Sequence, residues 1–230
     1  MTTRMLRGMT RTDADADRDQ RESAYSEGPT DRPTGRRPNP FTLPRGRLGR
    51  LAGWLMARTN MPVQRAVAAV LDIQPGQRLL EIGYGPGRLT RLLLDHTPVD
   101  LVAGVDPSPV MMAQARHATR HHRASGRVDL RLGEAAALPY PDGTFDHVVA
   151  VNTVAIWPDL DAGIREIHRV LRPGGALLIA WHSSSSPSAL QRRLGLSEDH
   201  LAAIKDAVAA VFGSTERREL GHVVAFLARR

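Results

Sequence analysis

A glycine-rich turn is the part of this 230-residue sequence whose residue types and spacing point most directly to chemistry. An apolar segment over 78–83 runs into Glu81-Ile82-Gly83-Tyr84-Gly85-Pro86-Gly87, and a helical pattern begins at Arg88. Glycines in such a turn adopt backbone conformations closed to other residues and let the backbone approach a ligand closely. A plain strand–helix connection has a similar composition, so the spacing must decide between the two interpretations.

The spacing disfavours two common nucleotide-binding turns. The dinucleotide fingerprint G-x-G-x-x-G needs a third glycine at position 88, which is occupied by Arg88. A P-loop ends in Gly-Lys-Ser/Thr, and this turn contains no lysine. Nucleoside triphosphates are therefore disfavoured, and a nicotinamide cofactor is a second choice.

Two further polar residues follow apolar, β-branched segments and could face a substrate. Asn152 comes directly after the segment 145–151, and His182 comes directly after the segment 176–181. A histidine in such a place is a candidate general base, although a polar loop residue is the simpler interpretation. His117 and His121 share a helical face, but no third ligand accompanies them, so we expect no metal site.

The elements that must position these residues alternate between strands and helices from residue 75 onward. Strands are predicted at 78–83, 100–106, 128–132, 145–151, 176–181, 216–220 and 222–228, and helices at 88–95, 109–123, 160–171 and 197–212. Repeated strand–helix units predict an α/β fold with a doubly wound, mostly parallel sheet and helices on both faces. The last two strands predict an antiparallel C-terminal hairpin at the edge of the sheet.

Motifs between residues 75 and 182 resemble, in order and spacing, the class I S-adenosylmethionine (SAM) dependent methyltransferases, which have a Rossmann-like fold. The resemblance is to the branch that includes ubiquinone and menaquinone C-methyltransferases and many small-molecule methyltransferases. The motifs are 79–87, Gly104-Val105-Asp106, Gly133-Glu134-Ala135 with Leu138-Pro139, Phe145-Asp146-His147-Val148-Val149 and Arg169-Val170-Leu171-Arg172-Pro173-Gly174-Gly175.

The resemblance implies SAM as the cofactor, bound where the first strands end. The residues expected to contact it are Glu81, Gly83, Tyr84, Gly85, Gly87, Asp106, Pro107, Ser108, Met111, Glu134, Ala135 and Asn152. Asp106 ends the second predicted strand, where a carboxylate can accept hydrogen bonds from both ribose hydroxyls; a helix cap is the alternative.

The resemblance also implies roles for the other polar groups. Glu134 would accept a hydrogen bond from the exocyclic amine of adenine, with Glu standing where Asp is commoner, and the Ala135 N–H would contact the ring. Glu81 would help to position the methionine end of SAM. Tyr84 and Met111 could line the methyl or adenine pocket, or could simply pack in the core.

Methyl transfer from a sulfonium requires the donor and the acceptor to be held in line, about 3–3.5 Å apart. A general base is needed only if the acceptor loses a proton, and His182 and Asn152 are the candidates for catalytic roles. We expect a small-molecule or lipid-like acceptor. The alternatives are a SAM-binding sensor or partner subunit without turnover and, third, an NAD(P)-dependent oxidoreductase.

The net charge of +7 is concentrated in one short segment. Residues 1–44 carry +1, residues 45–65 carry +5, and residues 66–230 carry +1. We predict a disordered tail over 1–44, a helical lid over 45–74 and a SAM-binding domain over 75–230. The near-neutral core argues against a nucleic-acid partner. The basic segment Arg45–Arg65 is compatible with contact to an anionic membrane surface, or with a solvated helix face.

Targeting signals are absent from the sequence as given. It has no cysteine, no apolar run long enough to span a membrane, and no apolar region of a secretory signal at its start. We therefore expect a cytoplasmic protein without disulfides, and the oligomeric state stays open.

Overall fold

The computed structural model describes residues 61–183 and 195–230. The predicted tail (1–44) and residues 45–60 of the predicted lid and of the basic segment lie outside the described residues. No helix in the described part of the chain is both long enough and apolar enough to cross a membrane.

The described residues form one sheet whose strands follow the order β3-β2-β1-β4-β5-β7-β6. β1 to β5 pair in parallel, whereas β7 runs antiparallel to both of its neighbours. The strands are β1 (Arg78–Ile82), β2 (Leu101–Asp106), β3 (Val128–Leu132), β4 (Phe145–Val151), β5 (Leu171–His182), β6 (Glu216–Leu220) and β7 (Val223–Arg229).

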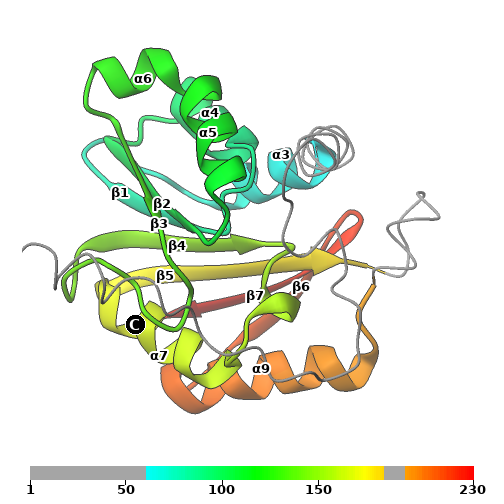
Figure 1. Ribbon diagram of the computed structural model, residues 1–230. Helices are drawn as coiled ribbons and strands as arrows, with labels where there is room; N and C mark the ends of the chain where they lie inside the picture. Colours follow the sequence, from blue (N-terminus) through cyan, green and yellow to red (C-terminus); the bar gives the residue numbers. More distant parts are fainter. Residues whose placement is uncertain (1–60, 184–194) are drawn as a thin grey trace, which may run out of the picture. The chain divides into compact units, whose positions relative to one another are not determined.

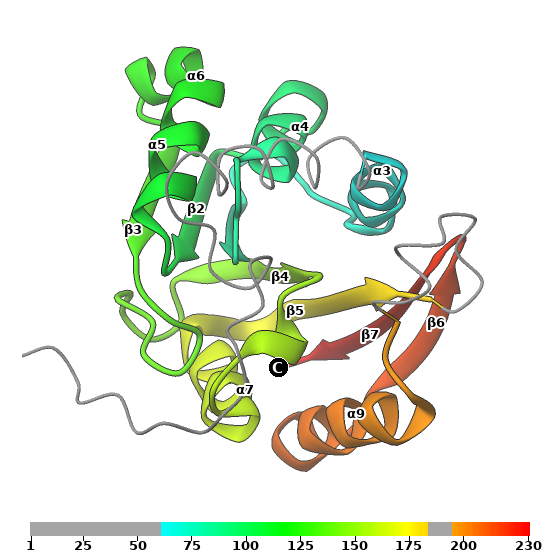
Figure 2. The same ribbon diagram turned by 45° about the vertical axis from the view of Figure 1, so that its right-hand side comes forward.

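Helices cover both faces of this sheet, as Figures 1 and 2 show. One face carries α3 (Met61–Val70), α4 (Arg88–His96), α5 (Pro109–Ala118) and α6 (Arg120–Ala124). The other carries α7 (Leu160–Val170) and α9 (Glu198–Phe212), and a 3-10 turn, η1 (Val154–Ile156), follows β4. The predicted Rossmann-like, doubly wound fold is therefore confirmed.

Burial on both faces explains why the central strands read as continuous apolar runs. On β5, Leu177, Ile179 and Trp181 pack in the cluster that includes α7 and α9 residues. Leu178 and Ala180, which alternate with them, pack in the cluster that includes α3 and α4 residues. A parallel strand covered by helices on both sides has no polar face to alternate with.

Two details differ from the sequence-based expectations, whereas the predicted antiparallel C-terminal hairpin is present at the edge of the sheet. The helix predicted over 109–123 is two helices that meet at Thr119, whose hydroxyl donates to the Ala115 carbonyl at 2.8 Å. β5 starts at Leu171, so the Arg172-Pro173-Gly174-Gly175 segment ends α7 but does not delay the strand. In the C-terminal hairpin, β7 is inserted between β5 and β6, which leaves β6 at the edge, running in the same direction as β5.

Candidate functional site

The glycine-rich turn joins β1 to α4 at the carboxyl end of the sheet. Gly83, Gly85 and Gly87 all have positive φ, at 75°, 51° and 76°. The Gly83 N–H donates to the Val105 carbonyl of β2 at 2.7 Å. Gly87 is the N-cap residue of α4 and has no side chain that could cap the helix. The first N–H groups of α4 therefore face the turn without a side-chain hydrogen bond.

Two of these glycines also permit close packing. A Cβ at Gly83 would lie 2.2 Å from Thr153 Cγ2, and a Cβ at Gly87 would lie 2.8 Å from the Ala115 backbone. Thr153 follows β4, and its hydroxyl donates to the Ile82 carbonyl at 3.1 Å. The turn is therefore pressed against the segment after β4, where the strand order reverses and open α/β sheets bind ligands. The sequence carried no signal for Thr153.

Asp106 connects the turn to the end of β2. One carboxylate oxygen accepts the Gly85 N–H and the other accepts the Ser108 N–H, each at 2.9 Å. Burial raises the pKa of Asp106, and these two backbone hydrogen bonds oppose the shift. The alternative role as a helix cap belongs instead to Ser108, whose hydroxyl accepts the Met111 N–H at the start of α5. Pro107, between them, is exposed.

Two predicted contact residues have side chains that pack inward. Tyr84 and Met111 are buried together with Ala115 and Leu130 between the sheet and α5. The Tyr84 hydroxyl donates to the Arg131 carbonyl at 3.3 Å, and burial raises the pKa of its phenol. These positions agree with the core-packing alternative for both side chains and leave their backbone groups at the turn and at the start of α5.

Glu81 is a buried carboxyl near the end of β1, with 4% of its surface exposed. Burial raises its pKa to about 8; the hydrogen bond from Thr90 opposes this shift, and the charge of Asp106 adds to it. The Thr90 hydroxyl on α4 donates to Glu81 Oε2 at 2.6 Å. Sequence reasoning missed Thr90, although a polar residue within the buried stripe of α4 was a usable signal.

The loop after β3 brings Glu134 and Ala135 to the carboxyl end of the parallel strands, where the glycine-rich turn also lies. Glu134 is exposed, Ala135 is 5% exposed, and a short bridge pairs Glu134 with Ala137. Within the described residues, the Ala135 N–H has no hydrogen-bond partner. An exposed carboxylate next to a backbone donor is the pair of groups that recognition of an adenine edge requires.

Asn152 directly follows β4, and His182 is the last residue of the neighbouring strand β5. Asn152 has a φ of 56°, which among the described residues is the one positive value outside glycine. Its N–H donates to the Ala180 carbonyl at 2.8 Å, and its side-chain oxygen accepts the His182 N–H at 3.1 Å. The sheet therefore brings these two candidates together and holds Asn152 in a conformation of higher energy.

Each of these residues also has a buried polar atom without a partner in the described part of the chain, Nδ2 of Asn152 and Nδ1 of His182. Burial lowers the pKa of His182 to about 4, so its ring is neutral at pH 7. Trp157, which follows η1, packs against α7 at Gly163. Among the residues with described positions, no group of three or more His, Asp or Glu side chains could hold a metal ion.

Comparison with known proteins identifies methyltransferases among the proteins that this chain resembles. Residues 80–179 match the family model described as a methyltransferase domain. The chain is 29% identical over 157 residues to the uncharacterized methyltransferase YdaC of Bacillus subtilis, and the match covers 68% of this chain and 84% of the relative. It is 37% identical over 117 residues to the demethylmenaquinone methyltransferase of Thermus thermophilus, covering 50% of this chain and 51% of that enzyme.

The fold comparison agrees with the sequence comparison. The crystal structure of a Methanococcus maripaludis protein, a putative S-adenosyl-L-methionine-dependent methyltransferase, superposes with a TM-score of 0.64. The superposition covers 77% of this chain and 91% of that protein at 17% identity, so this likeness concerns the fold.

Proposed function

Residues 80–179 form a class I SAM-dependent methyltransferase domain, and from this premise we propose that the chain transfers a methyl group to a small-molecule or lipid-like acceptor. The cofactor is SAM. In-line displacement at the methyl carbon would release S-adenosylhomocysteine.

The arrangement around Asp106 is the observation that best supports the fit of SAM to this chain. Its two oxygens each accept one backbone N–H, and an ionised carboxylate has about four acceptor positions. Two positions therefore stay available for the ribose hydroxyls, at the place where the glycine turn brings α4 close. Glu134 and the Ala135 N–H would hold the adenine, and Glu81 would lie toward the methionine end.

When bound, SAM supplies an electrophilic methyl group on a sulfonium. Glu81 would respond to that positive charge, because a nearby cation favours the ionised carboxylate over the protonated form that burial favours. The carboxyl would thus become a counter-ion when a cation arrives. Asp106 and the glycine turn would fix the nucleoside, so the position of the methyl group depends on β1, β2 and their loops.

Asn152 and His182 would face the acceptor from β4 and β5. The Asn152 Nδ2 can donate a hydrogen bond, and the neutral His182 ring can accept one or take a proton. Such a pair suits an acceptor that carries a hydroxyl or another protonated nucleophile. The likeness to a demethylmenaquinone methyltransferase supports a quinone-like or other apolar ring system as one class to test.

Calorimetry with SAM, S-adenosylhomocysteine and NAD, followed by an acceptor screen for S-adenosylhomocysteine release, tests this function. We expect SAM and S-adenosylhomocysteine to bind more tightly than NAD, and at least one hydroxylated or quinol acceptor to be turned over. Tighter binding of NAD would contradict the proposal and favour an oxidoreductase. Tight SAM binding with no turnover across acceptor classes would favour the non-catalytic sensor.

A further inference from the structure

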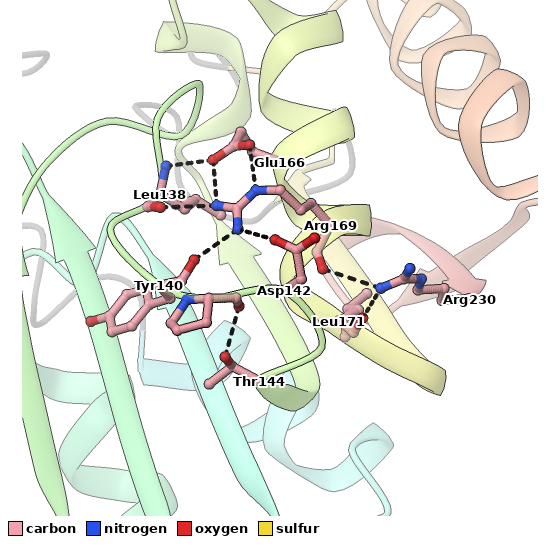
Figure 3. Close-up of polar contacts among 9 residues, drawn as sticks. Leu138, Tyr140, Asp142, Thr144, Glu166, Arg169, Leu171 and Arg230 are labelled. Atoms are coloured by element: carbon pink, nitrogen blue, oxygen red, sulfur yellow. Dashed lines mark hydrogen bonds and ion pairs between the residues drawn. The ribbon is translucent and has the colours of Figure 1, made fainter.

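The loop between β3 and β4, residues 133–144, has almost no regular structure, yet it carries Glu134 and Ala135. Apart from the bridge between Glu134 and Ala137, its order comes from contacts with other elements. Fixing the backbone of each residue costs conformational entropy, so a loop of this length needs strong contacts to hold one position. Figure 3 shows where many of them come from.

Arg169, in the last turn of α7, uses all five of its N–H donors. Nε donates to Glu166 Oε1 at 2.7 Å, and Nη2 donates to Glu166 Oε2 at 2.8 Å. Nη2 also donates to the Leu138 carbonyl at 3.0 Å. Nη1 donates to the Tyr140 carbonyl at 2.8 Å and to Asp142 Oδ1 at 2.7 Å. The planar guanidinium thus joins α7 to three residues of the loop, a geometry that lysine does not provide.

Glu166 completes the connection from the same helix. Its Oε2 accepts the Leu138 N–H at 2.8 Å, so both backbone polar groups of Leu138 are bonded to α7 side chains. The hydrogen bonds and charge of Arg169 lower the pKa of Glu166, which keeps the carboxylate ionised. The Gly143 N–H further donates to the Arg169 carbonyl at 3.0 Å.

A second arginine, on the strand before the loop, also bonds to it. Arg131 of β3 donates to the Pro139 carbonyl at 2.5 Å and lies 4.4 Å from the centre of the Tyr140 ring. The carbonyls of residues 138, 139 and 140 therefore each accept a bond from a guanidinium. Arg131 belongs to the strand that the loop leaves, whereas Arg169 comes from a helix about 30 residues further along the chain.

Helix α7 also contacts the end of the loop that carries Glu134 and Ala135. At Gly163, in its first half, the position of a Cβ would lie 3.4 Å from the Ala135 Cβ, so Ala135 packs directly on the helix. The same helix thus contacts the loop at Ala135 through packing and at 138–142 through Arg169 and Glu166. A displacement of the loop relative to α7 would move Glu134 and the Ala135 N–H together.

We propose that Arg169, with Glu166, is a positioning residue that sets where Glu134 and the Ala135 N–H meet the adenine of SAM. Through that placement, Arg169 determines how strongly the site prefers an amino group at adenine C6. The inference rests on the proposed function, because it takes Glu134 to recognise the adenine amine. Arg169 itself contacts neither the cofactor nor the acceptor.

The test compares affinities for S-adenosylhomocysteine and S-inosylhomocysteine, in which a carbonyl replaces the adenine amine. Calorimetry should show that the full-length wild-type chain prefers the adenosine compound. In Arg169→Met this preference should fall roughly tenfold, because a misplaced carboxylate loses a charge-assisted hydrogen bond. The preference should fall nearly as far in Arg169→Lys. It should fall less in Glu166→Gln, which keeps an acceptor for the Leu138 N–H.

Arg217→Met is the matched control. Arg217 of β6 makes a similar double hydrogen bond to Glu198 of α9, at 2.6 and 3.1 Å, on elements outside the predicted SAM site. This variant should keep the wild-type preference. If Arg169→Met does not fold, Asp142→Ala removes a single exposed partner of Arg169 and should lower the preference by a smaller factor.

Glu134→Ala provides the decisive comparison. The double variant Glu134→Ala/Arg169→Met should lose less of the preference than the two single losses combined, because both changes act through one carboxylate and only the contact of the Ala135 N–H with ring N1, which carries a proton in the inosine compound, is left for Arg169 to position. An equal loss of affinity for both ligands in Arg169→Met, with the preference unchanged, would overturn the inference and leave Arg169 a structural residue. Binding of neither ligand by the wild-type chain would instead refute the SAM assignment, and the inference with it.

Discussion

The buried carboxyl of Glu81 makes stability depend on pH in a way that one substitution removes. Its pKa is about 8 in the folded protein, against 4.5 for the group in water. The folded protein therefore keeps this proton to a higher pH than the unfolded chain does, and the associated stability is lost as pH rises through 8. For such a shift, the free energy of unfolding should fall by about 2 kcal/mol between pH 6.5 and 9.

Glu81→Gln removes the titration and keeps an oxygen that can accept the Thr90 hydroxyl. Urea denaturation of both proteins at pH 6.5, 7.5 and 9 measures the effect. The difference in unfolding free energy, wild type minus variant, should fall by about 2 kcal/mol over this range. The buried His147, His182 and Asp106 are present in both proteins, so their contributions largely cancel in the difference.

The exposed Glu219 on β6 offers a control with the same chemical change. The difference between wild type and Glu219→Gln should stay constant across the three pH values. A constant difference for Glu81→Gln as well would refute the reasoning, since it would mean that burial does not hold the proton on Glu81.

Four further predictions follow from the site. SAM binding should release a proton near pH 7 as Glu81 ionises, seen as a dependence of the calorimetric heat on the ionisation enthalpy of the buffer; no release would contradict the counter-ion role. Asp106→Ala should weaken SAM binding by roughly 100-fold, because two hydrogen bonds to a charged group are lost; unchanged affinity by calorimetry would refute the ribose role. Gly87→Ala should lower the free energy of unfolding more than Gly85→Ala does, since both have positive φ but only the Cβ at Gly87 would meet backbone, at 2.8 Å; equal losses in urea titrations would contradict this packing. Because burial lowers the pKa of His182 to about 4, kcat/KM should show no titration of this ring between pH 5.5 and 7, whereas an inflection near pH 6.5 that His182→Gln abolishes would show the ring to be solvated.

Three strands were predicted with the bounds that the structure has. β3, β4 and β6 all begin and end at the predicted residues, because local pattern and turn residues suffice to define them. The start of β5 was missed because Leu171 pairs with Phe145, 26 positions earlier, and that pairing outweighs the Pro-Gly-Gly sequence that follows it. The place of β7 inside the sheet likewise depends on pairing with β5.

For the candidate site, too, the sequence predicted some features and could not predict others. The positions of Asp106, Asn152 and His182 at strand ends could be read from the sequence, since the carboxyl ends of parallel strands share one edge. Their partners could not. Asp106 bonds Gly85, 21 positions away, and Asn152 bonds the His182 N–H, 30 positions away. A residue type predicts what a group can bond, but the fold decides which group lies within hydrogen-bonding distance.

By itself, the sequence determined the alternation of strands and helices, the glycine turn and the order of motifs that identifies the cofactor, because those properties are local or depend only on spacing. Tertiary structure decided that Tyr84 and Met111 point into the core, that Glu81 holds a proton, and that Arg169 joins α7 to the loop of Glu134. Burial and contact between distant segments set all three, and both exist only once the sheet has brought those segments together.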